Sequence, residues 1–222
     1  MKIIAISDTH GKHRDLEFRK SMPAGDMIIH AGDVSNVGTL AQINDFLYWF
    51  GGLDYEHKIF IAGNHDFMFE QNSVLARNLI PEGIHYLEDS SVTIDGIKIY
   101  GTPHSKLFMK WAFNRNKPQR KALWELIPED VDILVSHAPV YRILDAVDEQ
   151  YLAAGADANV GCPYLRDDVL FRIKPDILIC GHIHNQVGTE VVGNTTFYNV
   201  SVLNELYQCV NEPTVIEYDR IK

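Results

Sequence analysis

Short runs of apolar residues alternate with longer polar or amphipathic stretches along the chain. Runs of this length, rich in isoleucine and bounded by turn-forming residues, are typical of buried strands. Five of them lie at residues 2–7, 26–30, 58–62, 131–136 and 175–180. Between them, helical patterns predict helices at residues 39–50, about 67–78 and about 119–126, the last ended by Pro128.

Two hairpins are also predicted. Residues 91–100 turn at Asp95-Gly96 and residues 187–200 turn at Gly193-Asn194, and both dipeptides favour tight antiparallel turns. Early strands alternate with helices whereas late strands form hairpins, so we expect an α/β protein with mixed sheets. Because roughly ten strands are many for one open sheet, the expected architecture is two packed mixed β-sheets flanked by helices. No linker or repeat is visible, so residues 1–222 are expected to form a single domain.

Polar side chains follow each of the five apolar runs. In chain order the runs are followed by Asp-Thr-His, Ala-Gly-Asp, Gly-Asn-His-Asp, His-Ala-Pro and Gly-His-Ile-His. In right-handed α/β crossovers the carboxyl ends of the strands share one edge of the sheet. These turns are therefore expected to meet in space although they are far apart in the sequence.

The side chains of these turns form a candidate set of metal ligands. The set comprises Asp8, His10, Asp33, Asn64, His137, His182 and His184, with His65 beside it. It contains no thiolate, which disfavours a structural zinc site of the zinc-finger kind. These oxygen and nitrogen donors exceed what one transition ion takes. We therefore expect two divalent ions (Mn, Fe, Zn, Ni or Co, with manganese favoured) that share a carboxylate.

Composition narrows the classes of partner. Of the 222 residues, 46% are hydrophobic and 23% charged, which is ordinary for a globular protein. A net charge of −10 argues against generic binding to duplex nucleic acid or to an anionic membrane. The three cysteines are widely spaced, and no apolar run reaches the length of a membrane span or a signal-peptide core. From these features we expect a soluble, cytoplasmic protein with reduced thiols.

The order of the motifs resembles a known family. Asp-x-His, Gly-Asp, Gly-Asn-His-Asp, a lone histidine and Gly-His-x-His, spread from Asp8 to His184, are similar to the signature of the calcineurin-like metallophosphoesterase superfamily. Stretches such as IHAGD, WAFN and RIKPDILICGHIH resemble one branch, the metallophosphoesterase-domain proteins with cyclic-nucleotide phosphodiesterase activity. This resemblance implies hydrolysis of small phosphodiesters, such as cyclic nucleotides, by a hydroxide that bridges two metal ions.

The resemblance also implies roles for individual residues. It places Asp8, His10, Asp33 and His184 on one ion, and Asp33, Asn64, His137 and His182 on the other, with Asp33 as the bridge. It implies that His65 is the general acid, which protonates the departing alkoxide or otherwise stabilises charge beside the metals. Asp66 is expected to orient the imidazole of His65; the alternative interpretation is a plain helix N-cap, and both can hold.

Residues 101–121 form a basic and aromatic stretch in an otherwise acidic chain. The stretch holds six basic residues and no acidic one, with Trp111 among its aromatic residues. This composition favours an anionic ligand whose base could stack on an aromatic ring. The alternative is a loop whose aromatic residues pack on the core while its basic residues are solvated. The candidate substrate contacts are His104, Trp111, Asn114 and Asn204.

Other functions fit parts of the same pattern. The same core could serve a phosphomonoesterase, including a phosphoprotein phosphatase. A nuclease is disfavoured, because a duplex needs more positive surface than this composition supplies. A non-catalytic interaction module is the alternative from a different class, and the intact ligand set and His65 argue against it. The expected partner is a small phosphodiester or nucleotide.

Overall fold

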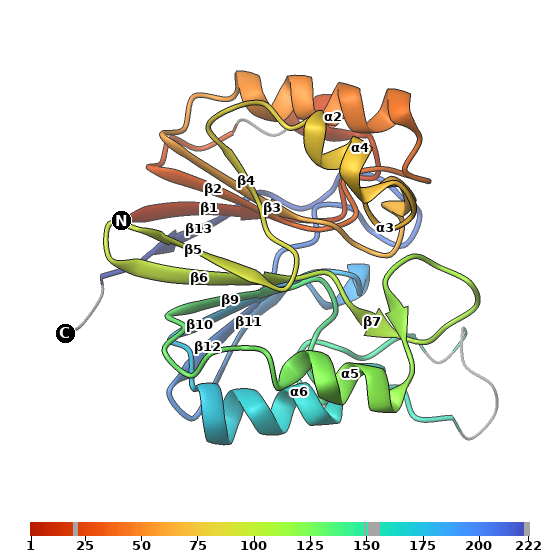
Figure 1. Ribbon diagram of the computed structural model, residues 1–222, viewed down its shortest axis with the longest axis vertical. Helices are drawn as coiled ribbons and strands as arrows, with labels where there is room; N and C mark the ends of the chain where they lie inside the picture. The colour runs from red at the N-terminus through yellow and green to blue at the C-terminus, as the bar shows by residue number, and fades with distance from the viewer. Residues whose placement is uncertain (20–21, 149, 151–155, 220–222) are drawn as a thin grey trace.

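The strands of the protein form two packed sheets, as the computed structural model shows for residues 1–19, 22–148, 150 and 156–219 (Figure 1). The first sheet has the spatial order β13 (Thr214–Glu217), β1 (Lys2–Ile6), β2 (Met27–Ala31), β3 (His57–Ile61) and β4 (Ile84–Tyr86). The second has the order β11 (Gly188–Val192), β12 (Thr195–Asn199), β10 (Ile177–Cys180), β9 (Ile133–Ser136), β6 (Ile97–Thr102) and β5 (Ser90–Ile94). Each sheet has parallel inner strands and at least one antiparallel edge strand, which confirms the predicted fold class.

Helices cover the outer face of each sheet (Figure 1). On the side of the first sheet are α1 (His13–Arg19), α2 (Leu40–Gly52), α3 (Phe67–Gln71) and α4 (Ser73–Asn78). On the side of the second are α5 (Lys117–Trp124) and α6 (Pro163–Asp168), which continues into the π-helix η2 (Val169–Ile173). The shorter elements are the pair β7 (Ser105–Lys106) and β8 (Asn114–Arg115), and the 3-10 helix η3 (His184–Gln186). Across the residues described, no helix has the length and apolar character that crossing a membrane requires.

The central strands β1, β2, β9 and β10 are largely apolar because both of their faces are buried. In β1, Ile3 and Ala5 pack against residues of the second sheet, whereas Ile4 and Ile6 pack beneath the helices of the first. Successive side chains of a strand point to opposite faces, so a central strand of this sandwich has no solvent-facing position. This explains why the sequence shows apolar runs rather than apolar–polar alternation.

Two predicted helices have different bounds in the structure. The stretch at 67–78 is two helices, broken at Asn72, whose φ of −134° and ψ of 48° are not helical. Asparagine has weak helix propensity and ends helices readily. The helix predicted at 119–126 begins earlier, at Lys117, because Asn116 and Gln119 form a capping box. A second capping box, between Thr39 and Gln42, begins α2 at the predicted place.

The three cysteines are buried in the interior, and no disulfide joins them. Cys162 accepts a hydrogen bond from Trp124 Nε1 at 3.3 Å, and burial raises the pKa of Cys180. These thiols serve as small core residues.

Candidate metal centre

The carboxyl ends of β1, β2, β3, β9 and β10 bring the predicted ligands together at one end of the sandwich (Figure 1). Three groups of side chains there have ligand atoms within 4.8 Å of one another. The groups are Asp8, His10 and His184; His10, Asp33 and His65; and Asp33, His137 and His182. Asn64 joins the third group, since its Oδ1 lies 3.1 Å from His137 Nε2. All seven predicted ligands are therefore close neighbours.

Asp33 lies between two of these groups. Its Oδ2 is 3.3 Å from His137 Nε2 and 3.7 Å from His10 Nε2. Its Oδ1 accepts a hydrogen bond from the backbone N–H of His65 at 2.8 Å. A carboxylate in this position can serve ions on both sides.

The turns that carry the ligands have an unusual backbone conformation. Asp8, His10, Asp33 and His182 have φ values of 56°, 45°, 54° and 68°. Left-handed φ is uncommon for residues other than glycine, costs about 1–2 kcal/mol each and clusters at functional sites. Packing around the strand ends must hold these four residues in the left-handed conformation. Nothing in the sequence pattern predicted this conformation.

Two glycines of the motifs allow the turns to approach one another. A Cβ atom at Gly63 would overlap the carboxylate of Asp33, and one at Gly181 would overlap the carboxylate of Asp8. The side chain of any other residue would push the ligands apart. This contact gives a physical reason for glycine in Gly-Asn-His-Asp and Gly-His-Ile-His.

Burial and charge set the protonation of the site. Burial acts to raise the pKa of Asp33, but His137 outweighs it and holds that pKa well below its ordinary value. Burial acts to lower the pKa of His137, but Asp33 raises it to about 9. For His10 and His182, burial dominates and lowers each pKa to about 4. At neutral pH these two imidazoles are thus neutral, as metal ligands must be, whereas His137 holds a proton that a metal would displace.

Backbone carbonyl groups orient three of the histidine rings. The Nδ1 of His137 donates to Ala31 O at 3.0 Å, and the Nδ1 of His184 donates to Asn204 O at 3.1 Å. The Nδ1 of His65 donates in the same way, at 2.7 Å, to the carbonyl of Asn36. Because a carbonyl oxygen can only accept, each Nδ1 carries the hydrogen and each Nε2 is left to face the site.

His10 indicates most directly that the donor set fits a metal ion. The residue is 5% exposed, and both ring nitrogens are buried without a hydrogen-bond partner in the described part of the protein. A buried polar atom without a partner costs about 1–3 kcal/mol. An ion held with Asp8 and His184 would satisfy one of these nitrogens, and imidazole with carboxylate is a donor set suited to divalent transition metals.

Asp66 occupies the predicted N-cap position of α3, but its side chain is bonded elsewhere. Its buried carboxylate accepts hydrogen bonds from Val34 N at 3.1 Å, Ser35 N at 2.9 Å, Ser35 Oγ at 2.6 Å and Gly63 N at 2.8 Å. Its side chain makes no capping bond to α3, and no bond to the His65 ring is found among the described residues. Asp66 instead ties the turn after β2 to the turn after β3, and thereby positions the ligands that these turns carry.

Two predicted substrate contacts lie beside the ligand groups. The ring of Trp111 packs on that of His65, with centroids 4.1 Å apart and an interplanar angle of 35°. Asn204 contributes its backbone carbonyl to His184, while its side-chain oxygen accepts from the backbone N–H groups of Leu206 and Gln208. Contact of either residue with substrate remains a prediction.

The other two predicted contacts are engaged within the protein. His104 is buried, and its Nε2 lies 2.7 Å from Asp89 Oδ2. Asn114 donates to Ser105 Oγ at 2.7 Å and accepts from Phe108 N at 2.9 Å, so it holds the β7–β8 loop together. These bonds explain the two residues without a ligand.

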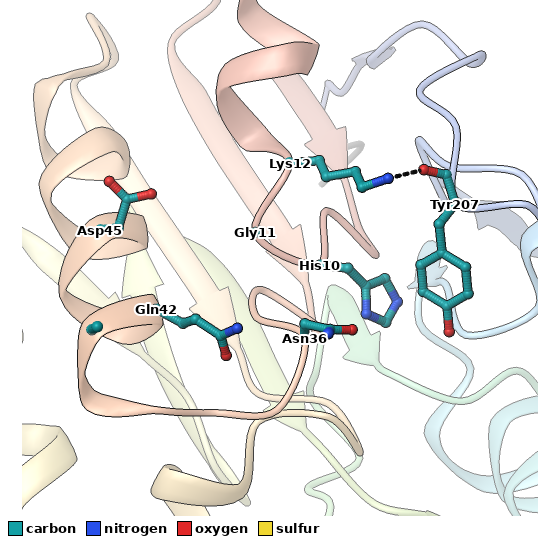
Figure 2. A pocket seen from close by; sticks show the side chains of 8 residues that line it. His10, Gly11, Lys12, Asn36, Gln42, Asp45 and Tyr207 are labelled. Atoms are coloured by element: carbon teal, nitrogen blue, oxygen red, sulfur yellow. Dashed lines mark hydrogen bonds between the residues drawn. The ribbon is translucent and has the colours of Figure 1, made fainter.

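An open pocket beside His10 was not predicted. It has a volume of about 610 Å³, and its wall includes Lys12, Asn36, Asp45 and Tyr207 (Figure 2). The Tyr207 ring meets the His10 ring edge-on at 4.8 Å, and Lys12 Nζ donates to the Tyr207 carbonyl at 2.5 Å (Figure 2). These residues come from turns and from α2, and a lone tyrosine or lysine in a turn carries no motif that could have identified it.

Comparison with known proteins agrees with this geometry. The family model described as calcineurin-like phosphoesterase matches residues 1–186. Metallophosphoesterase domain-containing protein 1 of Homo sapiens is 37% identical over 241 residues, which cover 97% of this chain and 70% of that protein. The crystal structure of phosphopantetheinyl hydrolase (PptH) from Mycobacterium tuberculosis superposes with a TM-score of 0.61 at 18% identity, covering 93% of this chain and 90% of the other. The last similarity supports the fold alone.

Proposed function

The chain belongs to the calcineurin-like phosphoesterase family, and on this basis we propose that it is a metal-dependent phosphodiesterase of small substrates such as cyclic nucleotides. The observation that carries the proposal is the position of three adjoining ligand groups beside an open pocket of about 610 Å³. Pockets of about 300–1,000 Å³ are typical of small-molecule sites. Duplex nucleic acid would need a much broader and more positive surface.

The donor set divides between two ions, with manganese favoured. We assign Asp8, His10, Asp33 and His184 to one ion, and Asp33, Asn64, His137 and His182 to the other, by the groups in which they lie. When bound, the ions supply positive charge for the phosphate and activate a water molecule as the nucleophile. The protein contributes the rigid strand ends, the glycine contacts and the Asp66 bonds that keep the ligands at these positions.

His65 is the residue we assign to the leaving group. Because its Nδ1 donates to the Asn36 carbonyl, only Nε2 can exchange a proton with substrate, and Nε2 donates only when the ring is the imidazolium. Trp111 packs on this ring and restrains its orientation. The pair can thus deliver a proton to one fixed position beside the ligand groups.

The pocket wall suggests where the rest of the substrate lies. Tyr207 is 37% exposed and offers a ring edge and face to a base or other flat group. The ammonium of Lys12 donates to the Tyr207 carbonyl and so ties the segment that carries this ring to the turn of His10 (Figure 2). We therefore propose that the nucleoside occupies this pocket while the phosphate faces the ligand groups.

A substrate panel on metal-reconstituted protein tests the proposal. The panel compares 2′,3′-cyclic and 3′,5′-cyclic nucleotides, an aryl diester and an aryl monoester, with metal-stripped protein as the control. We expect hydrolysis of diesters to exceed that of the monoester by at least about tenfold in kcat/KM, and the stripped protein to be inactive. Faster monoester hydrolysis would instead identify a phosphomonoesterase. A protein that binds both ions but turns over none of these substrates would favour an interaction module.

A further inference from the structure

A second, much smaller cavity lies behind the candidate metal centre and has a basic wall. Arg120 of α5 and His182 both line it, together with His104, Ser105 and Lys106, and its remaining wall is apolar. No carboxylate is among the described residues of this wall. The centre of a water-sized sphere can move through only about 10 Å³ of the cavity. That is room for one water-sized group and far too little for a nucleotide.

Arg120 is a buried cation, and two of its guanidinium nitrogens have no partner among the described residues. The residue is 6% exposed, and these two nitrogens, Nε and Nη1, are buried without a hydrogen bond. Two other arginines pair with carboxylates: Arg115 lies 2.7 Å from Glu70, and Arg172 lies 2.7 Å from Asp168. A guanidinium removed from water is strongly destabilising unless an anion and hydrogen bonds compensate it. Of the six basic residues in the stretch 101–121, Arg120 alone is buried.

His182 is the second possible donor on this wall. Its ring, which belongs to the group with Asp33 and His137, makes no hydrogen bond to the described residues, whereas its backbone N–H donates to the carboxylate of Asp8. Histidines that bind a metal normally donate their second ring N–H to an acceptor, as His137 and His184 do here to backbone carbonyls. Because His182 lines the cavity, an acceptor placed there could take a hydrogen bond from the second ring N–H of His182.

We propose that this cavity binds one small anion of the halide class, which accepts hydrogen bonds from the Arg120 guanidinium and from the second ring N–H of His182. The size of the cavity selects a monoatomic anion over phosphate or nucleotide. Arg120 supplies the buried positive charge of the wall. Lys106, whose side chain is exposed, adds a second cation. His104 is held by Asp89, so it is not the group that needs an anion.

The anion has a consequence for metal binding, which rests on the proposed role of His182. An anion that accepts from the second ring nitrogen fixes the tautomer of His182 and raises the basicity of the nitrogen that faces the ligand group. Halide and the second metal ion should therefore bind cooperatively. Changes at such outer partners alter metal affinity by about 10- to 100-fold.

Halide binding is measured first on metal-free protein, without substrate. Crystals grown in bromide should show an anomalous peak between Arg120 and His182. Chloride should raise the melting temperature relative to methanesulfonate at equal ionic strength. Arg120→Met should abolish this difference, whereas Lys121→Met, on the same helix but exposed over the Tyr164 ring, should keep it. A cavity without bromide would overturn the proposal even if Arg120→Met fails to fold, and so would an equal halide response in both variants.

The coupling is measured by titrating manganese into stripped protein in chloride and in methanesulfonate. We expect the second ion to bind roughly tenfold more tightly in chloride, and Arg120→Met to lose the difference. Equal affinity in the two salts would refute the coupling. Neither measurement uses catalysis, so a failure here is distinguishable from a failure of the phosphodiesterase proposal.

Discussion

Asp33→Asn removes one charge from the centre of the ligand groups and leaves the size of the side chain unchanged. In the wild type, Oδ2 of Asp33 lies 3.3 Å from His137 Nε2, and Asp33 raises the pKa of this buried imidazole from 6.5 to about 9 against the effect of burial. The difference corresponds to about 3 kcal/mol of stabilisation of the protonated ring. In the variant, burial still lowers the pKa of His137, but the charge of Asp33 that raised it is gone. The pKa of His137 should therefore fall toward 6.5 or lower.

The same change predicts a pH dependence of stability. A group whose pKa is raised by folding stabilises the protein fully below the pKa of the unfolded state, and this contribution is lost as pH rises through the folded pKa. For His137 that interval runs from 6.5 to about 9. Metal-free wild-type protein should therefore lose about 3 kcal/mol of unfolding free energy across it from this pair. Asp33→Asn should lack this loss.

NMR titration of the imidazole resonances and urea unfolding at several pH values measure both effects. Asp8→Asn is the matched control, because Asp8 lies 3.5 Å from His184 and acts to raise the pKa of that ring. The control should lower the pKa of His184 and change that of His137 much less. Calorimetric metal titration should show both ions weakened by Asp33→Asn and mainly one by Asp8→Asn. A His137 that still titrates near 9 in Asp33→Asn would refute the assigned pair, and loss of a single ion would refute the shared position.

Three further variants test the site. His65→Ala should keep both metals and slow turnover by roughly 10²- to 10⁴-fold, with a smaller loss for a nitrophenolate leaving group; loss of metal would show that His65 is a ligand. Trp111→Ala should lower kcat by up to about tenfold on nucleotide and aryl diester alike, because its ring restrains His65; a higher KM confined to nucleotides would show base stacking instead. Gly63→Ala should weaken metal binding by more than about 100-fold and destabilise the protein by about 1–3 kcal/mol, whereas Gly52→Ala, in open space at the end of α2, should leave metal binding unchanged. Equal metal affinity in the two glycine variants would contradict the role of the close contact.

Much of the fold and of the donor set followed from local pattern. Apolar runs bounded by turns predicted the central strands, because a strand buried on both faces must be apolar throughout. Asp95-Gly96 and Gly193-Asn194 predicted the two hairpins, because the left-handed conformations of those turns favour these residue types. The positions of the polar residues after the strands predicted their convergence, because parallel strands end at one edge.

What the sequence left open depends on which segments meet. The carbonyl groups that orient His65, His137 and His184 are backbone atoms present in every residue, so no side-chain pattern marks them. The same applies to the backbone N–H groups that donate to the carboxylate of Asp66. The sequence around Asp66 predicted only that it orients His65 or caps a helix. Such contacts are made between turns of different strands and exist only once both sheets are packed.

The chain itself determined which chemical groups stand at the strand ends: carboxylate, amide and imidazole in a set suited to divalent metals. Only the tertiary structure decided which of the basic residues of the stretch 101–121 would lose contact with water. Arg120 is buried because α5 packs against the second sheet, whereas Lys117 and Lys121 of the same helix remain exposed. Residue type sets the cost of burying a charge, but the packing of distant segments decides which charge is buried.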